Sequence, residues 1–385
     1  MKISAVISEF NPLHSGHIDL FRRTRENGST HIISVMSGNF VQRGDCAIYS
    51  KWDRALEAVK NGVDLVVELP SAKAVSSASN FAFAGVDIAD KCGCIDELFF
   101  GSECADIEKL NMISEILLDE KFVNALTKIY SEGFSYPTAR KMAFEHTGKR
   151  ELSDILDNPN DILAIEYIKS LKKLRSEIKP ICFQRKGEMH DSLNDKGDHL
   201  SSNCIRQKLL SGELPPKYPI HTLKNAEKAV LYKLRQMSSD ELKSIADVDE
   251  GLENRLKESI NNSNSIEEII ENCKTKRYTY SRLRRIIVCS LLSISRQDLY
   301  APVSYIKVLA FNERGREVLK IMKDTAKLPV IQKYSDILKI GDEKVIRDYQ
   351  REVSASDVYA LLSKDVECCG REQRENAIFI KIIDK

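Results

Sequence analysis

Short apolar runs alternate with longer helical patterns through the first hundred residues of the chain. The apolar runs are rich in β-branched residues, end at turn residues, and lie at residues 2–8, 31–36, 64–69 and 97–100. Apolar residues at helical spacing occupy the segments between them, at residues 17–27, 51–61 and 77–91. Strands that alternate with helices in this way predict βαβ units, a parallel sheet and right-handed crossovers. We therefore expect an α/β fold with a doubly wound parallel sheet.

The alternation stops after Gly101, and the remaining pattern is mostly helical. Residues from about 104 to 175 show only helical periodicity, which predicts a helical insertion. Residues 180–185 predict a fifth strand that returns to the sheet, and short strands are candidates in the second half at residues 303–311 and 328–332. We expect two domains, one with the sheet and its insertion at residues 1–216, and a mainly helical one at residues 217–385.

Charge and composition exclude several classes of protein. The 385 residues contain 58 Lys and Arg against 57 Asp and Glu, which excludes a uniformly basic nucleic-acid coat protein and an acidic tail protein. No apolar run approaches about 18 residues, so we expect no membrane span. The N-terminal run meets Glu9 early and lacks the features of an export signal. Ten scattered Cys are typical of reduced thiols, and we expect a cytoplasmic protein.

The strongest chemical signal is the segment EFNPLHSGH at residues 9–17, between the first strand and the first helix. In a doubly wound sheet this loop lies at the carboxyl end of a strand, where ligands bind. Gly16 allows a close approach of the backbone to a ligand, and the helix N-terminus offers N–H groups to an anion. The imidazoles of His14 and His17 can donate hydrogen bonds to a leaving pyrophosphate. The alternatives are a turn with incidental histidines and a metal site, for which no third ligand lies nearby.

This segment contains His14-Ser15-Gly16-His17, which resembles the HxGH signature of the nucleotidyltransferase superfamily of adenylyltransferases and class I aminoacyl-tRNA synthetases. Further segments, in the same order along the chain, resemble the bacterial tRNA(Met) cytidine acetate ligase family. They are Met36–Gly44, Lys51–Arg54, Gly133–Pro137, Pro159–Leu163, Gln184–Arg185 with His190–Asp191, and Arg277–Arg282. The resemblance covers nearly the whole chain and is most specific in the N-terminal motifs.

The resemblance implies an ATP-dependent ligase that activates acetate as acetyl-adenylate and releases pyrophosphate. The acetyl group then passes to N4 of the wobble cytidine of elongator tRNA(Met), giving N4-acetylcytidine and AMP. The implied partners are ATP, with Mg²⁺ expected on its phosphates, acetate and the anticodon region of this tRNA, with no obligate protein partner. Residues 1–216 would bind ATP and residues 217–385 would bind tRNA. The alternatives are a small-molecule adenylyltransferase of the same superfamily and an RNA-binding adaptor with a vestigial nucleotide fold.

Seventeen residues correspond to the ATP contacts of the family, and His14 and His17 are implied as catalytic. The ATP contacts are Ile7, Ser8, Glu9, Phe10, Asn11, Pro12, Leu13, His14, Ser15, Gly16, His17, Ile18, Asp19, Leu20, Gly101, Asn160 and Arg185. A guanidinium at Arg185 can hold phosphate with two hydrogen bonds, whereas Asn160 is equally typical of a helix N-cap. The sequence departs from the family at Asp161, usually Asn, and at residues 186–189, usually rich in Gly.

Basic and aromatic residues predict the tRNA surface. Seven cations between residues 274 and 296 precede the first acid at Asp298, with two tyrosines among them. Cations neutralise phosphates, and aromatic rings stack on unpaired bases, whereas a solvated helix face is the alternative. The tRNA-contact candidates are Arg43, Lys51, Arg277, Tyr280, Arg282 and Arg285. Residues 201–206 suggest a second anion site or an ordinary Ser N-cap, and the Cys spacing predicts no metal site.

Overall fold

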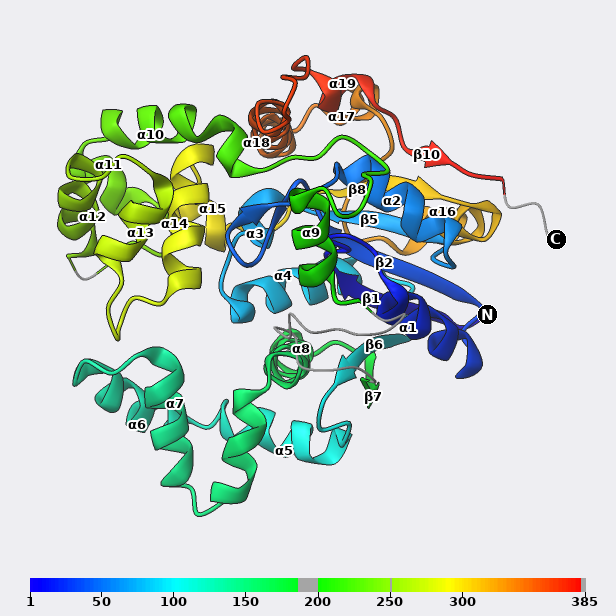
Figure 1. The fold of residues 1–385 in the computed structure, drawn as a ribbon. Helices are drawn as coiled ribbons and strands as arrows, with labels where there is room; N and C mark the ends of the chain where they lie inside the picture. The colour runs from blue at the N-terminus through cyan, green and yellow to red at the C-terminus, as the bar shows by residue number, and fades with distance from the viewer. Residues whose placement is uncertain (186–199, 250, 382–385) are drawn as a thin grey trace.

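An eight-stranded sheet lies at the centre of the computed structural model, which describes residues 1–185, 200–249 and 251–381 (Figure 1). The strand order is β10-β8-β5-β2-β1-β6-β7, and β9 pairs with β8. The strands are β1 (Ile3–Ser8), β2 (His31–Ser37), β5 (Leu65–Leu69), β6 (Glu97–Ser102), β7 (Lys179–Gln184), β8 (Ile306–Phe311), β9 (Val330–Ile331) and β10 (Ile378–Phe379). A separate hairpin is formed by β3 (Phe40–Val41) and β4 (Asp45–Cys46).

The five strands predicted from the first half of the chain are confirmed and are parallel. β1 pairs with β2 and β6, β2 pairs with β5, and β6 pairs with β7. Because β2 and β6 lie on opposite sides of β1, the strand order reverses at β1. In such a sheet the ligand crevice lies at the carboxyl ends of the strands beside this switch point. The loops after β1, β2, β6 and β7 are therefore the places to look for a site.

Three further strands come from the C-terminal part of the chain. β8 lies antiparallel to β5, and β9 and β10 pair in parallel with β8. The candidate strands at residues 303–311 and 328–332 are thus confirmed as β8 and β9. They extend the first sheet, so the expected division of the chain at residue 216 does not separate the sheet from the second half. An antiparallel strand can join a sheet edge without a neighbouring βαβ unit, so the alternation pattern could not indicate this.

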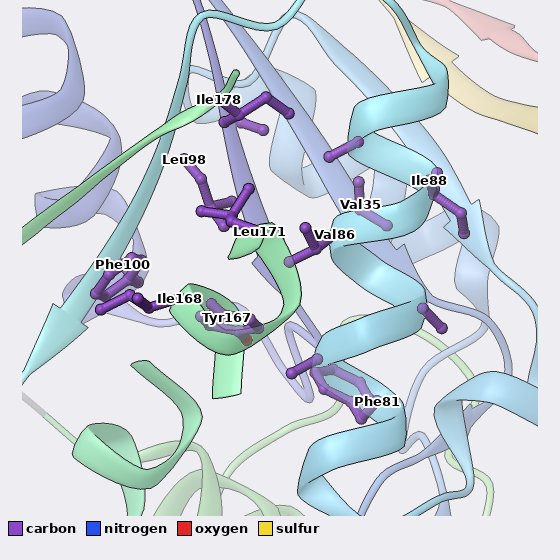
Figure 2. Close-up of a cluster of buried hydrophobic side chains, with 14 of the residues drawn as sticks. Val35, Phe81, Val86, Ile88, Leu98, Phe100, Tyr167, Ile168, Leu171 and Ile178 are labelled. Atoms are coloured by element: carbon purple, nitrogen blue, oxygen red, sulfur yellow. The ribbon is translucent and has the colours of Figure 1, made fainter. Parts of the chain in front are cut away.

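Helices cover both faces of the sheet, as the doubly wound prediction requires. The helices of the first half are α1 (Ser15–Glu26), α2 (Lys51–Lys60), α3 (Ser71–Ala74), α4 (Ala78–Lys91), α5 (Ile107–Ile116), α6 (Glu120–Ser131), α7 (Tyr136–Glu145), a 3₁₀ segment (Arg150–Asp157), α8 (Pro159–Leu174) and α9 (Ser202–Ser211). α1 and α2 pack on one face, and α4, α5 and α8 pack on the other. Figure 2 shows the side chains that meet between α4, α8 and the strands, among them Phe81, Val86, Leu98, Phe100, Tyr167 and Leu171.

The helical part of the second half has a hydrophobic core of its own. A 3₁₀ segment (Leu223–Ala226) and α10 (Glu227–Gln236), α11 (Ser239–Ser244), α12 (Leu252–Asn261), α13 (Ile266–Cys273), α14 (Tyr280–Leu292) and α15 (Arg296–Tyr300) form a group beside the sheet (Figure 1). The chain then returns to the sheet with α16 (Glu313–Thr325), α17 (Tyr334–Ile340), α18 (Glu343–Ala360) and α19 (Arg371–Arg374). Within the described ranges, no helix is long and apolar enough to cross a bilayer.

A buried charge cluster attaches the C-terminal segment to the sheet. The Nζ of Lys51, in the first turn of α2, lies 2.6 Å from the Glu68 carboxylate and 2.8 Å from the Glu372 carboxylate. Lys307 of β8 pairs with Glu372 as well. The Lys51 side chain is 1% exposed, so the assignment of Lys51 to the tRNA surface is wrong. Glu68, 17 residues away, and Glu372, 321 residues away, compensate its charge inside the protein, and the sequence around Lys51 indicates neither pairing.

Candidate active site

The loop after β1 is anchored from two directions. Phe10 has a left-handed backbone with φ of 44°, and its buried ring lies edge-on to the His17 ring, with 5.0 Å between ring centroids. The same ring meets Phe21 of α1 at 5.7 Å. The Asn11 side chain accepts the N–H of Ile48 at 2.8 Å. These contacts fix the place where α1 begins, at the carboxyl end of the switch-point strand.

The two histidines of the motif form the N-terminal cap of α1. The Nδ1 atom of His14 accepts the N–H of Gly16 at 3.0 Å, and Nδ1 of His17 accepts the N–H of His14 at 3.3 Å. The ring centroids are 3.9 Å apart. Because Nδ1 accepts in both rings, a neutral imidazole carries its proton on Nε2. The pair can therefore present two Nε2 donors beside the positive end of a helix, which suits a polyanion.

Gly16 is required by the position of the His14 ring. A Cβ atom at residue 16 would lie 2.8 Å from Cε1 and 3.1 Å from Nδ1 of His14. These atoms belong to a side chain that can rotate, so Ala at this position displaces the imidazole and leaves the backbone in place. Gly16 therefore leaves room for the His14 ring, and it also allows the backbone to approach a ligand closely.

We expect Gly16→Ala to fold and to lose activity. The rotated His14 no longer accepts the N–H of residue 16 and no longer donates from its original direction, so the rate should fall about 10- to 100-fold, since misplacing a catalytic group by about 1 Å has effects of this size. Steady-state rates together with the melting temperature provide the check. A rate within about twofold of the unsubstituted protein would show that the position of His14 does not matter.

Arg54 holds the loops after β1 and β2 together. Its buried guanidinium donates to the carbonyl oxygens of Glu9, Ser37, Gly38 and Tyr49. The Glu9 carboxylate accepts the N–H of Gln42 at 2.7 Å, and burial raises the pKa of Glu9. One side chain of α2 thus sets the spacing between the two motif loops. The sequence marked Arg54 only as part of a family segment and gave no sign of this role.

The start of α9 supports the motif loop from the other side. Ser201 caps α9 by accepting the N–H of Cys204, so the N-cap interpretation of this residue is confirmed. The Ser202 hydroxyl donates to the carbonyl of Pro12, and Nη1 of Arg206 donates to the carbonyl of Asn11 at 2.6 Å. The first turn of α9 therefore lies against the loop that carries the histidines.

The remaining ATP-contact candidates lie at the carboxyl ends of β6 and β7. Gly101 pairs with Phe183 across the two strands, and a Cβ atom at residue 101 would lie 3.7 Å from Arg185, which is an ordinary contact. Packing therefore does not require glycine there. Nη1 of Arg185 donates to Oδ1 of Asn160 at 2.6 Å. The N-cap alternative for Asn160 is wrong, because α8 begins at Pro159 and Asn158 occupies the cap position.

Asp161 shows why a departure from the family pattern is tolerated here. Its fully buried carboxylate accepts hydrogen bonds from the Ser102 hydroxyl, the N–H of Cys104 and Nδ2 of Asn158. Three donors converge on two oxygen atoms, an arrangement that a carboxylate satisfies. The departure therefore leaves the neighbouring Asn160 in place. Residues 186–199, which include the second departure and His190–Asp191, lie outside the described residues.

The predicted tRNA surface is smaller than the sequence suggested. Arg282 donates to the carbonyl of Asp247 and the carboxylate of Asp249, and Nε of Arg285 donates to the Asp247 carboxylate at 3.0 Å. Their side chains are 14% and 11% exposed and pair with these acids, and their contact with tRNA stays a prediction. The acids come from the segment before α12, which the local charge count did not include. Arg43 is exposed.

Other residues of the basic window lie at the surface or face the insertion. Lys274 and Lys276 are exposed, and the half-buried Arg277 lies over the ring of Tyr130 in α6, 5.4 Å from its centroid. The Tyr280 hydroxyl donates to Glu267, and Lys274 lies 5.9 Å from the Tyr280 ring centroid. The segment before α14 and the insertion therefore meet, although they are far apart in sequence.

The described residues offer no protein-held metal site. No group of three or more His, Cys, Asp or Glu side chains in the described ranges could hold an ion. All ten cysteines are free thiols. The histidine pair therefore belongs to no such group in the described ranges.

Comparison with known proteins identifies relatives over the full length of this arrangement. A family model described as HIGH Nucleotidyl Transferase matches residues 1–375. A tRNA(Met) cytidine acetate ligase of Caldanaerobacter subterraneus is 38% identical over 392 residues, which are 95% of this chain and 96% of the relative. One of Clostridium perfringens is 35% identical over 396 residues, covering 95% of this chain and 97% of the relative.

Solved structures agree with these matches. The apo crystal structure of Thermotoga maritima TmcAL superposes with a TM-score of 0.93 at 30% identity, and covers 99% of this chain and 100% of that chain. The structure of the same protein bound with alpha-thio ATP has a TM-score of 0.88 at 31% identity with the same coverage. The fold, the helical second half and the motif loops are therefore shared over the whole length.

Proposed function

This chain belongs to the tRNA(Met) cytidine acetate ligase family within the HIGH nucleotidyl transferases, and on that premise we propose how its residues carry out the reaction. ATP binds with its triphosphate at the start of α1, and acetate is activated as acetyl-adenylate. The acetyl group then passes to N4 of the wobble cytidine of elongator tRNA(Met). The observation that carries the proposal is the cap of α1. There Nδ1 of each imidazole accepts a backbone N–H, so a neutral ring carries its proton on Nε2 as a donor.

Activation requires stabilisation of a leaving group and no covalent enzyme intermediate. An acetate oxygen attacks the α-phosphorus in line, the bond to the bridging oxygen breaks, and pyrophosphate leaves with that electron pair. Nε2 of His14 and His17 donates to the departing oxygens, and the α1 N-terminus favours their negative charge. Gly101, Asn160 and Arg185 bound the other side of the crevice, where a guanidinium and bare backbone suit the rest of the nucleotide. The enzyme thus acts by positioning and preorganised charge.

Transfer needs the acceptor base at the same place. The N4 amine of cytidine attacks the carbonyl carbon of the mixed anhydride, AMP leaves, and the amine loses a proton to give the amide. A base in an anticodon loop leaves its stack at small cost, so the wobble cytidine can reach the anhydride. Mg²⁺ would be held by the ATP phosphates, whose negative charge it would help to neutralise.

We place the anticodon region between the insertion and the segment before α14. The exposed cations Lys274 and Lys276 and the ring of Tyr280 lie there, opposite Tyr130 of α6. Such a surface combines phosphate neutralisation with stacking. Ten free thiols agree with a reducing compartment, so we also propose that the protein works in the cytoplasm.

Replacing both Lys274 and Lys276 with Ala should weaken tRNA binding and reduce its dependence on salt. Each lost phosphate contact lowers the slope of log affinity against log salt by about 0.7 to 0.9, so the double variant should lose about 1 to 2. Titrations at several salt concentrations measure this slope. The matched control is the exposed pair Lys320 and Lys323 on α16, which packs on β2 and β5 and ends beside Cys92. An unchanged slope in the first variant would place the tRNA elsewhere.

The complete reaction is tested by mass spectrometry of nucleosides from tRNA incubated with the protein, ATP and labelled acetate. The proposal predicts labelled N4-acetylcytidine in elongator tRNA(Met) and its absence without ATP. Labelled product on a small molecule instead of tRNA would favour a small-molecule adenylyltransferase. The match of the relatives across the helical second half supports the tRNA substrate, because a small-molecule enzyme has no need of that part.

A further inference from the structure

Glu103 connects the loop after β6 to the first turn of α8. Its Oε1 atom accepts a hydrogen bond from Nδ2 of Asn160 at 2.6 Å and from the Asn160 N–H at 3.4 Å. Its Oε2 atom accepts the N–H of Asp161 at 2.9 Å. A single carboxylate therefore binds both the backbone and the side chain of a residue that lines the nucleotide crevice.

This contact replaces a cap that α8 does not make for itself. Asn158 occupies the N-cap position, but its side chain makes no capping hydrogen bond. Glu103 supplies the acceptor from another segment, and the helix dipole favours its negative charge. The carboxylate also borders an open hollow of about 410 Å³, which is lined as well by Cys104, Lys109, Leu152 and Ile155.

The carboxylate also decides which way the Asn160 amide faces. Nδ2 donates to Glu103, so Oδ1 points the other way and accepts Nη1 of Arg185 at 2.6 Å. A reversed amide would direct Nδ2 at the guanidinium and Oδ1 at the carboxylate, and both contacts would be repulsive. Burial lowers the pKa of Arg185, and the charge of Glu103 opposes this shift. The three side chains therefore form a chain in which the acid orients the amide and the amide orients the guanidinium.

We infer that Glu103 is a positioning residue for ATP, which acts by holding Asn160 and Arg185 in the direction that the nucleotide requires. The inference rests on the proposed function, because it assumes that ATP occupies the crevice beside Gly101. Glu103 does not touch the reacting atoms, so its loss should affect nucleotide binding more than the chemical step. It is not among the ATP contacts that the sequence predicted, because its role depends on α8, which lies 57 residues further along the chain.

The test is Glu103→Gln, which keeps the size of the side chain and replaces one acceptor oxygen with a donor. The amide of Gln cannot accept both the Asn160 side chain and the Asp161 N–H, so Asn160 and Arg185 lose their fixed direction. We expect the Kd and the KM for ATP to rise about 10-fold, while kcat changes by less than about twofold. The Kd is measured by calorimetry with ATP alone, and KM and kcat by pyrophosphate exchange.

The control separates positioning from helix capping. Asp119 caps α6 in the insertion by accepting the N–H groups of Lys121 and Phe122, at 2.8 and 3.3 Å. Asp119→Asn should lower the melting temperature by a similar amount and leave the KM for ATP unchanged. If the unsubstituted protein binds ATP and Glu103→Gln binds it equally well, Glu103 is a helix cap only and the inference is wrong. If the unsubstituted protein itself fails to bind ATP, the proposed function falls and the inference falls with it.

Discussion

Replacing His17 with Ala should lower acetate-dependent ATP–pyrophosphate exchange by about 100- to 1,000-fold, the effect of removing one preorganised donor to a developing anion. The substitution removes the Nε2 donor and also the acceptor for the His14 N–H at 3.3 Å, so the α1 cap loses this contact. The proposed tRNA surface lies on other elements, so tRNA affinity should stay within about twofold. Exchange assays without tRNA and binding titrations without ATP measure the two effects separately.

His146 is the matched control for this substitution. It lies exposed just after α7, where its Nδ1 contacts the carbonyl of Met142, and has no part in the crevice. His146→Ala should exchange pyrophosphate at the rate of the unsubstituted protein. A His17→Ala protein that loses tRNA affinity as severely as exchange would contradict the separation of the two sites, and one that keeps full exchange would remove the histidine from the chemistry.

Replacing Lys51 with Met should destabilise the protein by about 3–5 kcal/mol, because removing one partner of a buried ion cluster leaves charge without compensation. Glu68 and Glu372 are 2% and 0% exposed and would keep Lys307 as an ion-pair partner. The loss concerns the junction between α2, the sheet and the C-terminal segment. Denaturant unfolding gives the free energy of unfolding for each variant.

Two comparisons make this result specific to burial. Lys276→Met removes the same type of charge from an exposed position, and should change the free energy of unfolding by no more than about 0.5 kcal/mol. Adding Glu372→Gln to Lys51→Met restores the charge balance with Lys307 and Glu68, and should recover part of the loss. A Lys51→Met protein of unchanged stability but reduced tRNA affinity would return Lys51 to the tRNA surface.

The sequence predicted the elements whose signals are local. Apolar runs with β-branched residues gave β1, β2, β5, β6 and β7, and the Ser residues before α2, α4 and α9 cap those helices. The histidine motif was placed correctly at the carboxyl end of β1, because the strand, the loop and the start of the helix follow one another directly in the sequence. The antiparallel strand β8 was found as a strand, but its place in the first sheet depends on pairing with β5 across the chain.

The errors have one physical cause, which is that burial and pairing depend on residues distant in sequence. Lys51 meets Glu372, and Arg285 meets Asp247, at separations of 321 and 38 residues. A window of cations without nearby acids therefore overestimates the exposed positive charge. Glu103 was overlooked for the same reason, since its proposed role depends on the hydrogen bond that it accepts from the Asn160 amide. The residues proposed to contact the ligand lie in recognisable sequence motifs. Residues that position other side chains, such as Glu103, do not.

The most direct test of the account is exchange of labelled pyrophosphate into ATP by the purified protein in the absence of tRNA. If the imidazole pair and the start of α1 hold the triphosphate for attack by a carboxylate, exchange depends on added acetate and disappears in His17→Ala. Exchange that proceeds equally without acetate, or no exchange when acetate and ATP are both saturating, would contradict the formation of acetyl-adenylate at this site.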